Sequence, residues 1–375
     1  MKFAVSQEAL LQGVSKVAGI IPTRTTLPSL YNIQAVLSGG KLRLTASDGD
    51  IFVITEVQVE TLEEGSMLVP AQPLLNLLRE LPGADLDLET TQEQHLVVNT
   101  AKGRFTIPGE DPSNFPPAPE ERPPHKLTFS AEDFRKILNQ TTFAVSHDEL
   151  RPALTGLLFH IKVNELRAVS TDGHRLVKLV KTGFDTGAQT AGELEVIAPL
   201  RSLNLLSKHL ASDDVQIVDV FLAPNRMVFD TGQMVITSKV VEGKFPAYDA
   251  VIPKNNSLVL IADVETLSAA VRRVSIFSSQ LSRLVVLQLS SNQIKLSAED
   301  PDTGRHAQEE IDAKYEGEPF DIGYNANYLL ESLRHLDSKE VEIRLGSPTT
   351  AGIFKPLESR EDEDLLLLLM PIRLQ

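Results

Sequence analysis

Residues 166–173 read LRAVSTDG, an alternating apolar segment that ends in an acidic turn. Two similar segments lie about 125 residues away on either side, LRLTASDG at residues 42–49 and IKLSAED at residues 294–300. Period-two alternation followed by Asp-Gly is typical of a strand that enters a tight turn. Because the spacing is close to one third of the 375 residues, it indicates an internal threefold repeat.

A second feature recurs in the same order, namely a short apolar start, a small or proline residue, and a helical pattern. It reads VPAQPLLNLL at residues 69–78, IAPLRSLNLL at residues 197–206 and GYNANYLLESL at residues 323–333. A third feature is an amphipathic helix that opens each unit, with Ser6, Ser130 and Asp263 as expected N-caps. The patterns predict six helices, over residues 8–18, 73–81, 131–142, 201–210, 263–276 and 326–336.

Two breaks separate the repeats. Residues 108–124 contain seven prolines together with acidic residues, which is typical of a stiff polar linker, and residues 246–256 form a second break. The expected domains are therefore residues 1–120, 126–250 and 256–375. Each would hold two helices and several short strands, which predicts an α+β fold with mostly antiparallel sheets.

Composition excludes several classes of protein. The chain has no Cys, so it has no disulfides, thiolate nucleophiles or Cys-ligated metal sites. The formal net charge of −15 argues against a protein that coats nucleic acid through a uniformly basic surface. The opening residues are too polar for a signal peptide, and no apolar run approaches the roughly 20 residues of a membrane helix. We therefore expect a soluble cytoplasmic protein that does not contact membranes.

Charge is nevertheless distributed unevenly along the chain. The six predicted helices contain nine basic and seven acidic residues, so they carry +2 while the strands and loops carry the negative charge. If the helices shared one surface, that surface would be mildly positive. Lys and Arg near helix C-termini also complement the helix dipole, and the count alone favours this simpler interpretation.

Motifs for catalysis are absent from the sequence. It has no Walker loop, no G-x-G-x-x-G after a strand, no H-E-x-x-H and no G-x-S-x-G, and its eight His lack metal-ligand spacing. We therefore expect no metal and no cofactor. Asp172 and His174 would suit an acid/base pair of a hydrolase or transferase, but a surface turn is the commoner explanation because the other repeats carry acids at the same turn.

The C-terminus is unusually apolar. Residues 365–370 read LLLLLM, a predicted buried strand, and Ile372 and Leu374 follow Pro371. Chain termini are usually polar and frayed. The apolar tail therefore either packs onto the body or lines a groove for a partner, and the sequence leaves both open.

The chain resembles the bacterial DNA polymerase sliding clamps, the beta subunits of the replicative polymerase holoenzyme. The resemblance covers the full length and depends most on residues 171–176 (TDGHRL), 237–239 (TSK), 243–248 (GKFPAY) and 370–374 (MPIRL). It implies a non-catalytic processivity factor with three clamp domains per chain and a head-to-tail dimeric ring around duplex DNA. Implied partners are the polymerase catalytic subunit, an ATP-dependent clamp loader, other polymerases, and mismatch-repair and ligase-type proteins that carry short linear peptides. A peptide-binding adaptor without a DNA function is the other alternative.

The same resemblance implies three sets of site residues. A partner-peptide groove would comprise Leu154, Thr171, Gly173, His174, Arg175, Leu176, Pro246, Val251, Leu368, Met370, Pro371, Ile372, Arg373 and Leu374. The implied DNA-facing residues are Arg24, Arg79, Arg201 and Lys208. The implied dimer interface comprises Lys102, Arg104, Phe105, Ile107, Arg273, Ile276, Phe277, Glu309 and Glu310, although Phe105 and Phe277 also suit an intradomain core.

Three positions depart from the family pattern. Ala250 stands where some clamps have Arg, so one polar groove contact is in doubt. Pro152 and Ala153 replace aromatic residues found there in some members, and Gln375 extends past the usual Arg-Leu terminus.

Overall fold

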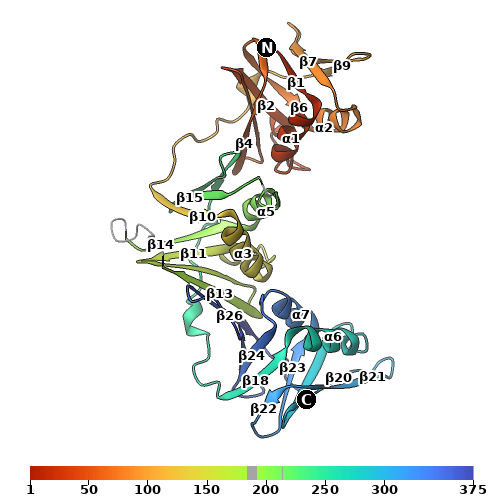
Figure 1. The fold of residues 1–375 in the computed structure, drawn as a ribbon, viewed down its shortest axis with the longest axis vertical. Coiled ribbons are helices and arrows are strands. Elements are labelled where there is room, and N and C mark those ends of the chain that lie inside the picture. Colours follow the sequence, from red (N-terminus) through yellow and green to blue (C-terminus); the bar gives the residue numbers. More distant parts are fainter. Residues whose placement is uncertain (184–191, 213, 375) are drawn as a thin grey trace. The chain divides into compact units, whose positions relative to one another are not determined.

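The computed structural model describes residues 1–183, 192–212 and 214–374 (Figure 1). Gln375 therefore lies outside the described residues. The chain divides into two compact units, one formed by residues 1–135 and 201–240 and the other by residues 136–200 and 241–375. Each unit contains two antiparallel sheets, and every strand pairing among the described residues is antiparallel.

The first unit contains a five-stranded and an eight-stranded sheet. The five-stranded sheet has the order β5 (Glu60–Glu63), β1 (Lys2–Ser6), β7 (Asp85–Thr90), β8 (His95–Asn99) and β9 (Arg104–Pro108). The eight-stranded sheet has the order β10 (His125–Ser130), β15 (Ile217–Ala223), β16 (Arg226–Asp230), β17 (Met234–Lys239), β4 (Ile51–Gln58), β3 (Lys41–Ser47), β2 (Asn32–Ser38) and β6 (Gly65–Pro70). The pairing of β17 with β4 joins the second repeat to the first, with Thr237 opposite Phe52.

The second unit contains a nine-stranded and a four-stranded sheet. The nine-stranded sheet has the order β14 (Leu194–Pro199), β11 (Gly156–Lys162), β12 (Glu165–Thr171), β13 (Arg175–Thr182), β26 (Glu363–Leu369), β25 (Gly352–Pro356), β24 (Glu340–Leu345), β18 (Leu258–Asp263) and β22 (Lys314–Tyr315). The four-stranded sheet has the order β21 (Arg305–Asp312), β20 (Gln293–Asp300), β19 (Leu284–Ser290) and β23 (Phe320–Asn325). Here β13 pairs with β26, so Leu176 lies opposite Leu368 and the second repeat joins the third.

Six α-helices lie where the sequence predicts them, with ends that differ from the prediction by at most two residues. They are α1 (Gln7–Ala18), α2 (Ala71–Glu80), α3 (Ala131–Thr141), α5 (Leu200–His209), α6 (Val264–Ser275) and α7 (Ala326–Arg334). The predicted start at residue 73 is two residues late, because Pro73 lies in the first turn of α2, where a missing N–H costs no helical hydrogen bond. The three expected N-caps are confirmed: Ser6, Ser130 and Asp263 accept from the backbone N–H of Ala9, Asp133 and Thr266.

The apolar faces of the helices form the core of each repeat. Leu10, Val14 and Val17 of α1 are buried, and α1 packs against α2 just as α6 packs against α7. No helix within the described ranges is long and apolar enough to cross a membrane. The α+β class with antiparallel sheets is confirmed, whereas the exact domain limits stay a prediction.

The acidic turns that suggested the repeat share one hydrogen-bonding pattern. Asp48 Oδ1 accepts from the N–H groups of Asp50 and Ile51, and Asp172 Oδ1 accepts from those of His174 and Arg175. Asp300 likewise accepts from the N–H of Asp302. Asp therefore recurs because its carboxylate closes the turn on its own backbone, which is the reason Asp favours such turns.

Candidate functional sites

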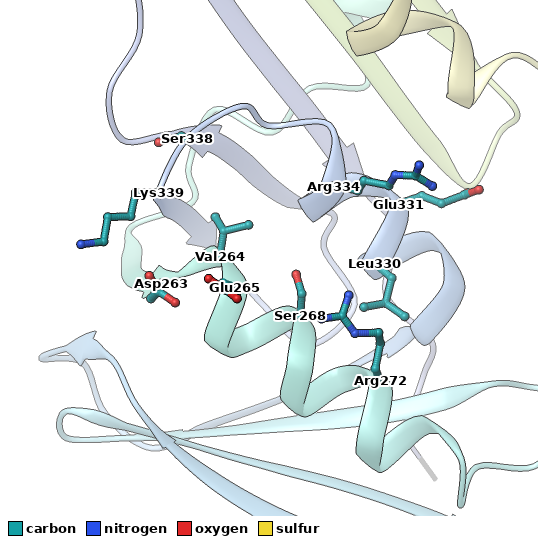
Figure 2. Close-up of a pocket in the computed structure, with 10 residues that line it drawn as sticks. All are labelled: Asp263, Val264, Glu265, Ser268, Arg272, Leu330, Glu331, Arg334, Ser338 and Lys339. Atoms are coloured by element: carbon teal, nitrogen blue, oxygen red, sulfur yellow. The ribbon is translucent and has the colours of Figure 1, made fainter.

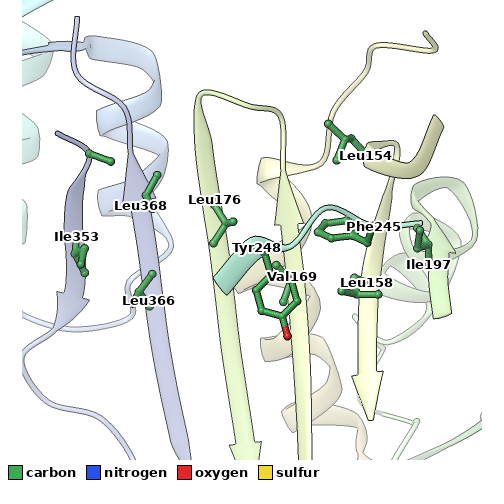
Figure 3. Packing of buried hydrophobic residues seen from close by; sticks show 11 residues of the cluster. Leu154, Leu158, Val169, Leu176, Ile197, Phe245, Tyr248, Ile353, Leu366 and Leu368 are labelled. Carbon is green, nitrogen blue, oxygen red and sulfur yellow. The ribbon is translucent and has the colours of Figure 1, made fainter. Parts of the chain in front are cut away.

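An apolar cluster covers the junction of the second and third repeats. It lies beside the pairing of β13 with β26 and includes three of the expected groove residues, Leu154, Leu176 and Leu368 (Figure 3). Phe245 and Tyr248, from the segment that follows β17, pack across the same cluster. The groove set implied by the resemblance does not include these two aromatic residues, although both belong to the motif at residues 243–248.

Exposed apolar side chains surround this cluster. Met370 is 45% exposed and Val251 is 60% exposed, although both are large hydrophobic residues. Pro246 and His174 are also exposed. An apolar cluster with an exposed apolar rim is the arrangement expected of a docking site for a short apolar segment.

The C-terminal tail packs onto the body of the protein. The N–H of Met370 donates to the carbonyl of His174 at 2.8 Å, and the N–H of Ile372 donates to the carbonyl of Gly323 at 2.8 Å. A Cβ on Gly323 would lie 2.8 Å from Leu374 Cδ2 and 3.1 Å from the Ile372 carbonyl oxygen, so a larger residue there would force the tail to shift. The tail thus borders the junction while the sheet of the third repeat holds it, and Arg373 points into solvent as an exposed residue.

The hypothesis of an acid/base pair at Asp172 and His174 is not supported by their contacts. Asp172 uses one carboxylate oxygen for the turn and the other for Arg175 Nε, at 3.0 Å. His174 stacks on Tyr328 of α7, with ring centroids 5.9 Å apart. Thr171 Oγ1 donates to the carbonyl of Arg175, and Gly173 has a φ of +93°, so both residues serve the turn.

Arg175 is almost completely buried, with 8% of its surface exposed. Besides Asp172, its guanidinium donates to the Phe143 carbonyl at 2.9 Å and to the Glu331 carboxylate. It also lies against two rings, 4.7 Å from the centroid of Tyr328 and 5.2 Å from that of Phe143. Arg175 was expected to line the groove, but its guanidinium is already paired with carboxylates and a carbonyl of this chain.

A polar network holds the segment that carries Tyr248. The Tyr248 hydroxyl lies 2.8 Å from His160 Nδ1, and Asp249 pairs with Arg167 and Lys178 at 2.8 Å and 3.2 Å. Burial opposes ionisation of Asp249, but the hydrogen bond from Lys178 and the two nearby cations outweigh it and lower the pKa of that carboxyl. Ala250, next in the chain, is exposed and supplies no polar group to this edge of the junction.

Four basic residues were expected to face DNA, and their surroundings differ. Arg24, Arg79 and Lys208 are exposed and form no ion pair within the described part of the chain. Arg201, by contrast, pairs with Asp48 at 2.9 Å and donates to the Ile20 carbonyl at 2.7 Å. The four residues are indistinguishable in the sequence because local sequence does not reveal such distant partners.

The repeat register identifies one further cation. Arg79, Lys208 and Arg334 are the ninth residues of α2, α5 and α7, helices that each follow the same strand of their repeat. Arg334 is also exposed and forms no ion pair among the residues described. The DNA-facing set implied by the resemblance does not include Arg334, although its position in the repeat matches those of Arg79 and Lys208.

A cavity of about 730 Å³ lies between α6 and α7. Figure 2 shows Arg272 and Ser268 on α6, and Arg334 and Glu331 on α7, around this cavity. Acids such as Glu265 also line it. The cavity is therefore lined by both cations and anions. Such a lining favours weak contacts with an anion over tight binding of one.

Two strands of the predicted dimer interface lie at open sheet edges. β9 ends the five-stranded sheet and β21 ends the four-stranded sheet. Phe105 of β9 is 37% exposed, while Ile276 and Phe277, after α6, are 69% and 38% exposed. Ile107 is instead buried within the sheet of its own repeat. An edge strand with exposed apolar neighbours is a template for pairing with another chain.

Charged residues accompany both edges. Lys102 and Arg104 are exposed beside β9, and Glu310 on β21 is exposed as well. Arg273 Nε donates to Glu309 at 3.0 Å, and this hydrogen bond holds the pKa of Glu309 below its usual value. The basic edge and the acidic edge are complementary in charge.

No group of three or more His, Asp or Glu side chains within the described ranges is arranged to hold a metal ion. We accordingly assign no metal ligands.

Three family models match successive parts of the chain. The DNA polymerase III beta subunit N-terminal domain matches residues 1–119, the central domain residues 128–247 and the C-terminal domain residues 249–373. Relatives named beta sliding clamp include those of Pseudomonas putida KT2440 (33% identical over 377 residues) and Escherichia coli K12 (31% over 376 residues), and each comparison covers 100% of both chains.

Solved structures of sliding clamps are also similar to this chain. The sliding clamps of Pseudomonas aeruginosa and Bartonella birtlesii, each bound to griselimycin, are both 30% identical to this chain with a TM-score of 0.93. Both comparisons cover 100% of each chain.

Proposed function

This chain belongs to the family of the bacterial DNA polymerase III beta subunit, the beta sliding clamps, and from that premise we propose how its sites perform the work of a clamp. Members of this family are non-catalytic processivity factors, so the chain is a sliding clamp and not a hydrolase or transferase. Two copies join head to tail, with β9 of one protomer alongside β21 of its partner. Each chain supplies both edges, so the ring closes through two identical interfaces.

The ring encircles duplex DNA without reading its sequence. The observation that carries this proposal is the cation repeated at one helical position, Arg79, Lys208 and Arg334, exposed and without an ion pair among the described residues of a chain with a net charge of −15. Phosphate contacts from such side chains are independent of sequence, and mixed charges such as those around Arg272 and Glu265 keep them weak enough for sliding.

Partner proteins bind at the apolar cluster that covers the junction of the second and third repeats. Short linear peptides with a Gln and a few apolar residues dock against Leu154, Leu176, Val251, Leu368 and Met370. Through this groove the ring tethers the replicative polymerase, other polymerases, and mismatch-repair and ligase-type proteins. A separate ATP-dependent loader opens the ring in the cytoplasm, because the chain itself has no nucleotide-binding loop.

Replacing the repeated cations should weaken DNA contact while the ring stays intact. In R79Q/K208Q/R334Q we expect affinity for a short open duplex to fall roughly 10-fold at low salt. The slope of log affinity against log salt should fall by about 0.9 for each phosphate that the variant no longer neutralises. Fluorescence anisotropy over a salt series measures both quantities.

The matched control is K41Q/K314Q/R344Q, which removes three strand cations and the same net charge. It should leave the salt slope unchanged. If the three helical cations only complement helix dipoles, R79Q/K208Q/R334Q would lower the melting temperature and leave DNA affinity at the control value, which would refute their assignment to DNA.

A further inference from the structure

Each junction between consecutive repeats contains one arginine that ties three elements together. At the first junction, Arg201 of α5 pairs with the Asp48 carboxylate at 2.9 Å and donates to the Ile20 carbonyl at 2.7 Å. At the second, Arg175 donates to the Asp172 carboxylate at 3.0 Å, the Phe143 carbonyl at 2.9 Å and Glu331 of α7.

The acceptors of the two arginines occupy the same places in the repeat. Asp48 and Asp172 close equivalent turns. Ile20 is the second residue after α1, and Phe143 is the second residue after α3. Each arginine thus binds two acceptors that belong to one repeat: the carboxylate of the acidic turn and a carbonyl just after the first helix.

The arginine itself comes from opposite sides of the two junctions. Arg201 is the second residue of α5, whereas the second residue of α7 is the exposed Asn327. Arg175 follows its turn Asp by three positions, whereas the first repeat has the buried Ile51 there. The turn therefore does not require an arginine, and the helix does not require one either. What recurs is a guanidinium between the same two acceptors.

We propose that Arg175 is a positioning residue of the partner groove, fixing the wall formed by residues 171–176 against α7, and that it does not itself bind the partner peptide. This rests on the proposed function of the groove. The guanidinium is buried and paired with Asp172 and Glu331, and the rings of Phe143 and Tyr328 lie against it. On the same wall, Leu176 belongs to the apolar cluster and His174 stacks on Tyr328 of α7.

Comparison of the two junctions suggests the variants that test this role. R175I installs the residue of the first junction and removes the guanidinium, whereas R175I/N327R supplies a guanidinium from α7, as Arg201 does from α5. The probe is a fluorescein-labelled peptide with one Gln, two Leu and one Phe, and anisotropy measures its affinity. We expect R175I to bind it roughly 10-fold more weakly and R175I/N327R to recover to within about 3-fold of the unaltered protein. N327R alone should match the unaltered protein.

Recovery in the double variant is the result that a direct peptide contact by Arg175 would not give. If R175I/N327R binds as weakly as R175I, or if R175I binds normally, the positioning role is wrong. Hydrogen exchange of the amides of residues 171–176 gives a second readout without peptide. Exchange should quicken in R175I and slow again in R175I/N327R, and an unchanged rate in R175I would overturn the proposal. Failure of the unaltered protein to bind the peptide would instead refute the groove, while hydrogen exchange would still decide the role of Arg175.

Discussion

The I276D variant is expected to be a monomer at concentrations where the unaltered protein is a dimer. Ile276 is 69% exposed, precedes Phe277, and follows by three positions Arg273, which donates to Glu309 of the edge strand β21. In the proposed ring this side chain is covered by Phe105 and β9 of the partner protomer. A carboxylate there would be desolvated against the apolar side chains of the partner protomer, which is a costly change at an interface.

We expect the dimer dissociation constant to rise roughly 100-fold, which corresponds to about 2.8 kcal/mol. Sedimentation velocity over a concentration series measures it. The matched control is L62D, because Leu62 is an exposed apolar residue on β5, at the opposite edge of the five-stranded sheet from β9. It should remain dimeric. Dimeric I276D, or equal dissociation of the two variants, would contradict the proposed interface.

The M370D variant should lose partner-peptide binding while keeping the dimer. Met370 is 45% exposed at the rim of the apolar cluster, and its backbone N–H is held by the His174 carbonyl. A charge at this position would have to be desolvated by an apolar peptide, while the backbone contact that places the tail would persist. We expect the affinity for the Gln/Leu/Phe peptide to fall about 30-fold, or about 2 kcal/mol.

Peptide affinity by anisotropy and dimer mass by sedimentation separate the two roles. V163D places the same charge on an exposed apolar residue in the turn between β11 and β12 and should bind peptide normally. Peptide binding by M370D at the level of V163D would show that the groove lies elsewhere.

The fold was predictable because its determinants are local and occur three times. Alternation marks the strands, 3.6-residue periodicity marks the helices, and Ser6, Ser130 and Asp263 mark helix starts that the hydrogen bonds confirm. The predicted helix limits were less accurate. The predicted start of α2 at Pro73 was two residues late, because a proline is tolerated in the first turn of a helix.

Contacts between distant residues were not predictable from local pattern. The sequence is compatible with two roles for the apolar tail, and the hydrogen bonds of Met370 to His174 and of Ile372 to Gly323 show where it packs. Asp172 lies three positions from Arg175, but Glu331 is 156 positions away, so local sequence does not reveal this second partner. The same holds for Arg201 and Ile20, 181 positions apart. Arg334 is different, since the repeat register contains its signal.

Retention on circular DNA tests most directly whether this protein encircles duplex DNA. The protein is loaded onto nicked circular DNA with a clamp loader and ATP, washed at high salt, and the DNA is then linearised. We predict that the clamp stays on the circle through the wash and is released when the DNA is cut, because a ring holds DNA by topology. Loss in the salt wash, with binding that ignores linearisation at low salt, would mean ordinary electrostatic contact and would contradict the ring. Salt-resistant retention after linearisation would also contradict it, because a ring slides off a free DNA end.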